Sequence, residues 1–350
     1  MIFALLLAVP VAWGELPAAI QRQLPVAQAG FSEYLREIEG DTRRRVAEGE
    51  MEHLVYFILQ SKSFTRQPVV EPALSRGSPD VVRLRFQDYL SGRTVIRTPR
   101  LQYFRTHLAP TEADLWRSYE KAMEFLERMD YPVRGHSSDT SLAASYTVWN
   151  AINVMKAVNP KVDIRRVLII GPGADFAPRT GFDETNPPQS YQPYAVAAAL
   201  GDGVAVDCAD VNERVLAMIS SRKPKFRREA GTEEFIRYQR SLGASAVRAQ
   251  ISPVKLNIVT ERLDRKYDLI VATNVLLYFP PAHLALALAN IEGMLNPGGY
   301  FIHNDTRAES GLDTAELGLT TIQARSILVA QGRKAPLYDV FGLLRKASRR

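Results

Sequence analysis

The sequence is poor in cysteine and in closely spaced metal ligands. Cys208 is the single cysteine among 350 residues, so no disulfide can form within the chain. Because it lies in an apolar run, we expect a small buried side chain rather than a reactive thiol. The five histidines are scattered, without the spacing that zinc sites use. Disulfide-stapled folds and zinc motifs are therefore excluded, and we predict no metal site.

A long apolar segment is also missing at the N-terminus. Residues 2–13 form an apolar run of twelve, whereas a membrane-spanning helix needs about 20 residues. With the small residues Ala12 and Gly14, residues 1–14 have features of a signal peptide, although no basic stretch precedes the run. A buried N-terminal segment is the alternative. Both a cytoplasmic and an exported location stay open, and we expect any membrane association to involve the N-terminus only.

Charge of one sign is not strongly in excess. The net charge of +6 is modest for 350 residues, and the composition, 46% hydrophobic and 23% charged, is typical of a globular protein. Basic clusters occur at residues 43–45, 222–228 and 345–350, without the interleaved aromatic residues on which single-stranded nucleic acids stack. We interpret these clusters as solvated charge and do not expect nucleic acid to bind.

The most informative segment is residues 165–173, in which two arginines precede an apolar run, residues 167–170, that ends abruptly in Gly171-Pro172-Gly173. Further apolar runs follow at residues 204–209, which lead into Asp210, at 267–272, which lead into Asn274, and at 300–303. Predicted helices at 212–220 and 283–295 separate them, with a short strand at 255–260. This alternation predicts an α/β fold with a doubly wound, mostly parallel, Rossmann-like sheet. Two closing runs, 321–329 and 338–345, predict an antiparallel pair at its edge.

The preceding part of the chain has helical rather than strand periodicity. We expect helices at 31–38, 51–62 and 113–129, and a further one at 141–158 that leads into the first strand. The predicted organisation is therefore a helical N-terminal region at 15–138 and a Rossmann-like domain at 139–350. A basic, polar insertion is expected at 222–248.

From residue 145 to residue 346, the order and spacing of these segments resemble the class I S-adenosylmethionine-dependent methyltransferases. Residues 267–279, Tyr-Asp-Leu-Ile-Val-Ala-Thr-Asn-Val-Leu-Leu-Tyr-Phe, are similar to the corresponding strand of the chemotaxis-receptor glutamate methyltransferases. The resemblance implies S-adenosylmethionine as cofactor and methyl transfer to a small-molecule or protein acceptor.

The resemblance also assigns a cofactor site. Gly171, Pro172 and Gly173 would pass under the methionine part and ribose of the donor, and Asp210 would accept hydrogen bonds from both ribose hydroxyls. Glu261 would lie near the adenine and Asn274 would face the cofactor. Ligands of doubly wound sheets bind at the carboxyl ends of the strands, where these residues are expected. Asp207 is an alternative to Asp210.

The glycine loop departs from the pattern of this superfamily in two places. Ile169 stands where an acid is usual, two residues before the first glycine, and Asp175 stands where a third glycine is common. The distance from Gly173 to Asp210, 37 residues, exceeds the spacing of about 20 in a compact dinucleotide-binding unit. The excess, residues 175–189, predicts a loop over the site that acts as a lid or marks a remodelled pocket.

No catalytic residue stands out from the sequence. Substrate-side candidates are Tyr191, Tyr194, Tyr278, His303 and Asp305, and His136 lies in a segment that the resemblance places near the methyl donor. Methyl transfer requires a positioned nucleophile and, where that nucleophile is protonated, a base. A carboxylate acceptor needs no base, so a missing base excludes nothing.

Two other functions remain as alternatives. A nicotinamide-dependent dehydrogenase is disfavoured, because Phe176 occupies the third glycine position of the dinucleotide-binding motif. The other is a non-catalytic binding protein, exported or membrane-tethered, that keeps the methyltransferase fold. The altered glycine loop and the signal-like N-terminus favour it.

Overall fold

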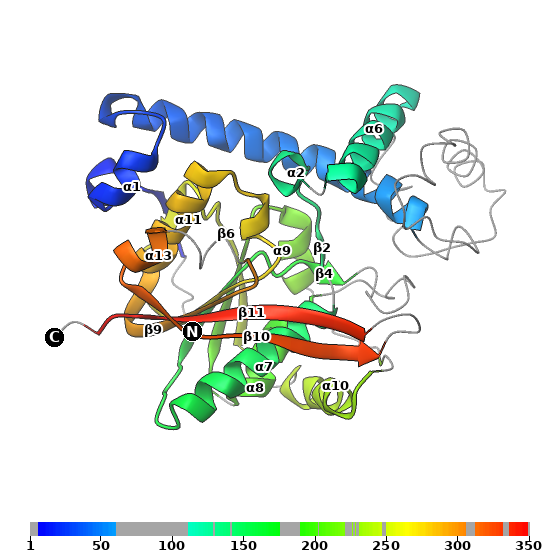
Figure 1. Ribbon diagram of the computed structural model, residues 1–350, viewed down its shortest axis with the longest axis vertical. Coiled ribbons are helices and arrows are strands. Elements are labelled where there is room, and N and C mark those ends of the chain that lie inside the picture. Colours follow the sequence, from blue (N-terminus) through cyan, green and yellow to red (C-terminus); the bar gives the residue numbers. More distant parts are fainter. Residues whose placement is uncertain are drawn as a thin grey trace.

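The computed structural model describes most of the chain outside a few segments. The described residues are 6–60, 111–128, 130–140, 142–175, 190–201, 203–220, 226, 228, 231–246, 250–305, 312–331 and 336–348. Within them the fold is a mostly parallel sheet with helices on both faces, preceded by a helical N-terminal region (Figure 1). The predicted α/β, doubly wound class is confirmed.

The described residues form a main sheet of seven strands in the order β10-β11-β9-β8-β3-β5-β6. The strands are β3 (Arg166–Ile170), β5 (Ala205–Asp210), β6 (Gln250–Lys255), β8 (Tyr267–Ala272), β9 (Leu295–His303), β10 (Leu319–Gln331) and β11 (Pro336–Lys346). Neighbours from β6 to β9 are parallel, and β11 runs antiparallel to both β9 and β10. The order reverses between β3 and β8, so the switch point of the sheet lies there.

The predicted closing antiparallel pair at the edge of the sheet is confirmed, and the structure adds the order of its two strands. The last strand of the chain, β11, lies inside the sheet between β9 and β10, and β10 forms the edge. Leu343 and Leu344 on opposite faces of β11 are completely buried, whereas β10 keeps many exposed positions. A strand that is apolar on both faces is stable only when it is covered on both sides.

The prediction of a strand at residues 255–260 is wrong. The strand β6 covers Gln250–Lys255, and the following residues turn, with the Thr260 amide donating to the Asn257 carbonyl (3.0 Å). Pro253 obscured the strand in the sequence, because proline donates no hydrogen bond and is tolerated mainly at sheet edges. Strand β6 is an edge strand.

Side chains of β3 alternate between the two apolar layers. Leu168 and Ile170 pack in one cluster with α11 (Pro281–Met294) and α1 (Ala18–Gln23). Val167 and Ile169 pack in the other with helices of the opposite face, α7 (Leu142–Val158), α8 (Gln192–Leu200), α9 (Glu213–Ser220) and α10 (Glu233–Ala246). A parallel strand buried on both faces needs a continuous apolar run, which residues 167–170 supply.

The insertion predicted at 222–248 contributes to the core. Its described part includes α10, whose Phe235, Tyr238 and Leu242 are completely buried. Phe235 and Tyr238 pack against Tyr146 of α7, at ring-centroid distances of 5.1 and 5.3 Å. The segment is therefore amphipathic, with its polar residues facing outward.

The N-terminal region contains one long helix where two were predicted. Helix α2 runs without interruption from Phe31 to Gln60, through Gly40 and Gly49, and packs against α6 (Glu112–Arg128). The short helices η1 (Trp13–Glu15) and η2 (Gln28–Gly30) precede it. In Figure 1, α2 crosses above one edge of the sheet and α6 lies beside its second half.

The N-terminal segment is part of the packed structure. Strand β1 (Ala8–Pro10) pairs antiparallel with β7 (Glu261–Leu263), and Val11, Leu16 and Ile20 are buried in the cluster that covers the sheet. Residues 1–5 lie outside the described residues. The signal peptide and the domain division at residue 138 stay predictions.

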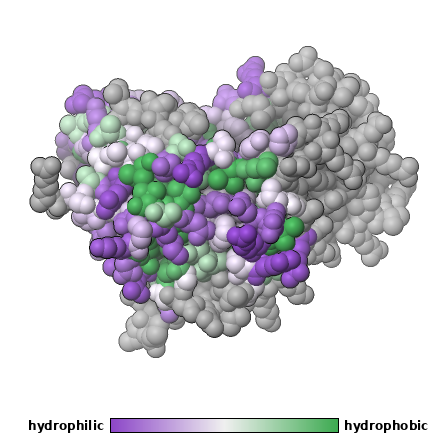
Figure 2. Space-filling model, turned by 60° about the horizontal axis from the view of Figure 1, so that its bottom comes forward, coloured by the Kyte–Doolittle hydropathy of each residue, from purple (hydrophilic) through white to green (hydrophobic). Residues whose placement is uncertain are grey.

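The surface is mixed in polarity. On the face shown in Figure 2, apolar areas alternate with polar ones. Large exposed apolar side chains among the described residues are Leu7, Val9, Val133, Val158, Tyr338 and Val340. No helix within the described ranges is both long and apolar enough to span a bilayer.

Candidate functional site

The glycine loop after β3 lies at the switch point of the sheet. Gly171 and Gly173 have φ angles of +61° and +57°, which favour glycine, and the Gly171 amide donates to the Ala209 carbonyl (2.8 Å). A Cβ at Gly171 would lie 2.3 Å from Cγ2 of Val275, and one at Gly173 would lie 2.9 Å from Cβ of Thr140. Both glycines are therefore required by the backbone and by close neighbours.

Asp210 ends β5 next to this loop and is 9% exposed. Its carboxylate accepts a hydrogen bond from the Asn212 amide (2.8 Å), and the amides of Val211 and Gly173 also stabilise its charge. Burial raises the pKa of Asp210 to about 7, and the nearby carboxylate of Glu50 adds to this rise. Asp210 is thus a buried carboxyl that ionises near neutral pH.

Asn274 follows β8 in the left-handed conformation, with φ of 58°. Asparagine tolerates this region better than most residues. Its amide N–H donates to Oδ1 of Asn304, and Nδ2 of Asn304 donates back to its Oδ1, both at 2.8 Å. This amide pair joins the ends of β8 and β9 and fixes the Asn274 side chain.

Four residues of the predicted cofactor site line one small cavity of about 90 Å³. They are Gly171, Gly173, Asp210 and Asn274. The remaining lining comes from neighbouring strand ends, loops and helices: Thr42, His136, Ser137, Thr140, Ile170, Ala209, Val211, Leu256, Asn257, Ile258, Thr273, Val275, Tyr278 and Phe279. Tyr278, a catalytic candidate, lies in η4 (Leu276–Tyr278). The structure thus brings four dispersed polar positions together at the switch point.

The other residues assigned to the cofactor lie differently. Pro172 is buried, does not line this cavity, and its carbonyl accepts a hydrogen bond from Ser190 (3.5 Å). Glu261 lines a neighbouring cavity, where its Oε2 accepts the Asn257 amide (3.0 Å). Asp207, the alternative to Asp210, is held by Arg265 (3.0 Å) and the Tyr267 hydroxyl (2.9 Å). Asp207 therefore has a structural role.

His303 and Asp305 line a separate cavity of about 230 Å³, between the end of β9 and the β10–β11 pair. Nδ1 of His303 accepts the Asp305 amide (3.3 Å), and burial lowers the pKa of His303 to about 4. Tyr191 and Tyr194 are buried and pack against Phe226. These four candidates do not line the cavity that contains Asp210.

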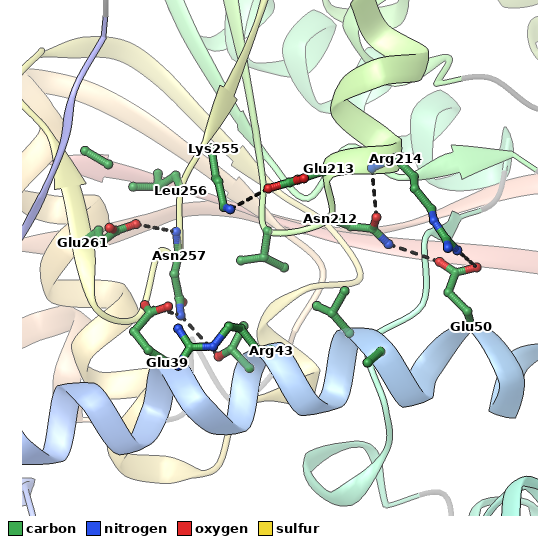
Figure 3. Close-up of a pocket in the computed structure, with 15 residues that line it drawn as sticks. Glu39, Arg43, Glu50, Asn212, Glu213, Arg214, Lys255, Leu256, Asn257 and Glu261 are labelled. Atoms are coloured by element: carbon green, nitrogen blue, oxygen red, sulfur yellow. Dashed lines mark hydrogen bonds and ion pairs between the residues drawn. The ribbon is translucent and has the colours of Figure 1, made fainter. Parts of the chain in front are cut away.

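A larger cavity of about 660 Å³ adjoins the small one and shares Thr42, Val211, Leu256 and Asn257 with it. Figure 3 shows it between α2 and the strand ends of β5 and β6. Its carboxylates are all engaged: Glu39 with Asn257, Glu50 with Asn212, Glu213 with Lys255, and Glu261 with the Asn257 amide. We refer to the two adjoining cavities under α2 together as the cleft, and their size is in the range of ligand sites.

Helix α2 covers this cleft and is tied to it at several points. Asn257 Nδ2 donates to Glu39 Oε1 (2.8 Å) and to Thr42 Oγ1 (3.2 Å). Asn212 Nδ2 donates to Glu50 Oε1 (3.1 Å). Because Asn212 also donates its backbone amide to Asp210, Glu50 and Asp210 hold the same residue from two sides. We call α2 and residues 131–140, which face it, the roof.

Arg45 joins the two parts of the roof. Its guanidinium is 4% exposed and donates to the carbonyls of Arg134 (2.6 and 2.9 Å), Tyr131 (3.2 Å) and Tyr278 (3.1 Å). Burial lowers the pKa of Arg45. A buried guanidinium is stable only when hydrogen bonds compensate its lost hydration, and three carbonyls do so here.

The two parts of the roof touch through glycines. A Cβ at Gly49 would lie 2.1 Å from the His136 carbonyl oxygen, and one at Gly135 would lie 2.6 Å from Cα of Gly49. Further along, β2 (Asp139–Thr140) pairs in parallel with β4 (Ala174–Asp175), directly after the glycine loop. The backbone from residue 135 to 140 is therefore clamped between α2 and the glycine loop.

No chemical role was predicted for α2 from the sequence. Thr42, Arg45, Gly49 and Glu52 follow helical spacing, and a glycine within a helix costs about 1 kcal/mol relative to alanine. An interior glycine at such a position indicates a close approach of another segment. Gly49 was thus the available signal, although it does not identify the segment that approaches.

Two other expectations fall on parts of the site that are not described. The side chain of Asp175 and all of residues 176–189, the predicted lid with Phe176, lie outside the described residues. Searched over its described parts, the chain shows no cluster of three or more potential metal ligands.

No family model matches the chain, and no curated protein matches its sequence. It is similar in structure to the N-methyltransferase NodS of Bradyrhizobium japonicum WM9 bound to S-adenosyl-L-homocysteine, with 16% identity and a TM-score of 0.35 over 57% of this chain and 87% of NodS. Similarity also extends to magnesium protoporphyrin IX methyltransferase ChlM of Synechocystis PCC 6803 with bound SAM, with 12% identity and a TM-score of 0.36 over 69% of this chain and 100% of ChlM. TrmN of Thermus thermophilus has 16% identity and a TM-score of 0.32 over 59% of this chain and 52% of TrmN. TM-scores this low do not by themselves establish a shared fold or function. The fold assignment therefore depends on the strand order and register described above.

Proposed function

We propose that the protein is an S-adenosylmethionine-dependent methyltransferase of the class I superfamily, which it resembles in the order of its sequence segments. The observation that carries the proposal is the convergence of Gly171, Gly173, Asp210 and Asn274 on one cavity at the switch point. The donor would lie in the cleft under α2, with its methionine part toward the glycine loop and its adenosine toward the larger cavity.

The residues of the cleft fit such a donor. Asp210 is a buried acceptor at the end of β5, suited to bind two adjacent hydroxyls, since a carboxylate can accept several hydrogen bonds at once. At Gly171 and Gly173 a ligand can approach the backbone closely. Val211 and Leu256, which line both cavities, and Ile258, which lines the small one, supply apolar surface for a flat base. When bound, S-adenosylmethionine supplies an electrophilic methyl group on a sulfonium.

The protein's own contribution would be positioning and exclusion of water. The roof covers the cleft, and the buried guanidinium of Arg45 ties it to Tyr278 beside the small cavity. A covered site keeps water away from a reactive methyl group and holds the nucleophile in line. The acceptor is a small molecule or a protein side chain. We do not propose the non-catalytic alternative, because the described N-terminal residues pack into the cluster that covers the sheet and both glycines of the altered loop line the cavity.

Calorimetric titration with S-adenosylhomocysteine tests the proposal, because this product binds without reacting. We expect binding in the micromolar range, and Asp210→Ala should weaken it at least about tenfold, since a hydrogen bond to a charged group contributes about 1.5–3 kcal/mol. Asp163→Ala is the matched control, because this carboxylate is exposed and pairs only with Arg165 among the described residues.

Wild-type protein that neither releases heat nor gains thermal stability at millimolar S-adenosylhomocysteine or S-adenosylmethionine would contradict the proposed function. Binding that Asp210→Ala and Asp163→Ala affect equally would contradict the role given to Asp210.

A further inference from the structure

His136 is held against the glycine loop by backbone contacts on both sides. Its amide donates to the Arg45 carbonyl (2.8 Å), and the preceding Gly135 amide donates to Glu52 Oε2 (2.8 Å). Two residues further on, the Ser138 carbonyl accepts the amide of Ala174 (2.7 Å), which directly follows Gly173. The position of His136 is therefore fixed relative to α2 and to the glycine loop.

The side chain of His136 is half-buried and lines the small cavity together with Tyr278. The two rings pack edge to face, with 5.3 Å between their centroids. Both rings line the same cavity as the glycine loop and Asp210 at the end of β5. The methionine half of a donor whose ribose binds Asp210 would extend toward Gly171, Gly173 and these rings.

The groups that titrate among the lining residues are Asp210, His136 and Tyr278. Asp210 is engaged by the backbone amides of residues 173, 211 and 212. The phenol of a tyrosine is a poor proton acceptor at neutral pH, whereas imidazole is the side chain most often used as a general base there. His136 is therefore the suitable group.

We propose that His136 is the general base of the reaction and that the acceptor therefore attacks through an O–H or N–H group. As the oxygen or nitrogen of the acceptor bonds to the methyl carbon, its proton passes to the imidazole and the electron pair of the breaking C–S bond stays on sulfur. The imidazolium then releases the proton to solvent. A carboxylate acceptor would need no such base. The inference rests on the proposed function.

Charged groups from each neighbouring segment surround His136. Arg45 and Glu52 of α2 bond to its loop, Lys121 pairs with Glu52, Arg134 lies two residues before it in the chain, Tyr278 faces it from η4, and Asp210 lines the same cavity. These groups are the same whichever ligand occupies the cleft. A difference in the pKa of His136 between two complexes therefore reports the charge of the ligand.

The test is a histidine titration by NMR on the full-length protein, without acceptor, saturated either with S-adenosylmethionine or with S-adenosylhomocysteine. The first carries a positive sulfonium and the second a neutral thioether. If His136 lies beside the reacting centre, the sulfonium disfavours its protonated form, and we expect its pKa to be lower by about one pH unit in the S-adenosylmethionine complex. His136→Gln assigns the signal, and His283, which contacts Tyr34 away from the small cavity, is the internal control.

The outcomes separate the two proposals. Binding of both ligands with a pKa of His136 that is equal, or higher in the S-adenosylmethionine complex, would overturn the role of His136 and leave the methyltransferase proposal standing. A shift of the same size at His283 would also overturn it, since the charge would then act through a general change of the protein. Failure of both ligands to bind would overturn the proposed function and this inference with it.

Discussion

The cleft has two walls of different origin. Its floor consists of the loops that follow β3, β5 and β8, with Gly171, Gly173, Asp210 and Asn274. Its roof consists of α2 and the loop facing it, with Arg45, Gly49 and Glu50. The floor is built from residue types whose position after a buried strand already indicates their role. The roof is built from charged residues of a helix, whose role depends on what the helix covers.

This difference predicts that the floor determines which ligand binds, whereas the roof determines whether the cleft exists. Floor residues line the cavity with two glycines, the Asp210 carboxyl and the Asn274 side chain. Many polar side chains of the roof form hydrogen bonds within the protein. Four of them bond to other segments: Glu39, Thr42, Arg45 and Glu50. Substitutions in the two walls should therefore differ in kind.

The largest effect is expected for Arg45→Met in the roof. Methionine keeps the apolar stem but leaves the carbonyls of Tyr131, Arg134 and Tyr278 without the donor that they now share. We expect a loss of about 5 kcal/mol in the free energy of unfolding, measured by urea denaturation, because a hydrogen bond to a charged group contributes about 1.5–3 kcal/mol.

The neighbouring Arg44 provides the matched control. Its side chain is 55% exposed and pairs with Asp41 and Glu48 of the same helix, so Arg44→Met should cost less than about 1 kcal/mol. Equal losses for the two variants would show that the roof is not anchored through Arg45.

A smaller effect, dependent on pH, is expected for Asp210→Asn in the floor. The pKa of Asp210 is about 7 in the folded protein against 3.8 as its ordinary value, so the folded state binds more protons between these pH values. Stability conferred by a carboxyl of raised pKa is present at low pH and is lost as the pH rises through the folded value. Asparagine does not titrate. Asp210→Asn should therefore gain about 3–4 kcal/mol relative to wild type between pH 4 and pH 8.

Thermal or urea unfolding of both proteins at several pH values measures this gain. Glu213→Gln is the control, because Glu213 is exposed and follows closely in the same loop and helix. The gain should be confined to Asp210→Asn. A difference between Asp210→Asn and wild type that stays constant with pH would contradict the raised pKa and the burial that causes it.

The floor could be predicted from sequence because parallel strands all run in the same direction. The residues that follow β3, β5 and β8 must emerge at the same edge of the sheet, whatever the loops between them do. That rule does not say which strand ends face one ligand. His303 and Asp305 emerge at the same edge, yet the pair of Asn274 and Asn304 stands between their cavity and the cleft. Neighbouring strands lie about 4.8 Å apart, so two strands suffice to separate two cavities.

The roof could not be predicted because its contacts join residues far apart in sequence. Glu50 and Asn212 are separated by 162 residues, and Arg45 and Tyr278 by 233. Periodicity showed that helices form near these positions but left α2 divided in two, since Gly40 and Gly49 interrupt its pattern. The order of the closing pair, with β11 between β9 and β10, was not predicted for a related reason. Both closing runs are rich in β-forming residues, and only burial on both faces distinguishes the inner strand from the edge.

The smallest effect is expected where the roof meets the floor, at Glu50. Glutamine keeps an oxygen that can accept from Asn212 but removes the negative charge that helps to raise the pKa of Asp210. Glu50→Gln should therefore lower the pH at which Asp210 ionises by a few tenths of a unit, and the midpoint of the pH dependence of S-adenosylhomocysteine binding should move by the same amount. At pH 6.5 the affinity should rise by less than about threefold, because an ionised carboxylate accepts hydrogen bonds from ribose hydroxyls more strongly than a neutral one.

Glu48→Gln removes a charge of the same sign from the same helix, from a residue that pairs with Arg44 and Lys121, and should leave the midpoint unchanged. Weaker binding for Glu50→Gln at every pH, with an unmoved midpoint, would show instead that the charge of Glu50 is needed to hold Asn212, and the roof would then act on the ligand through geometry alone.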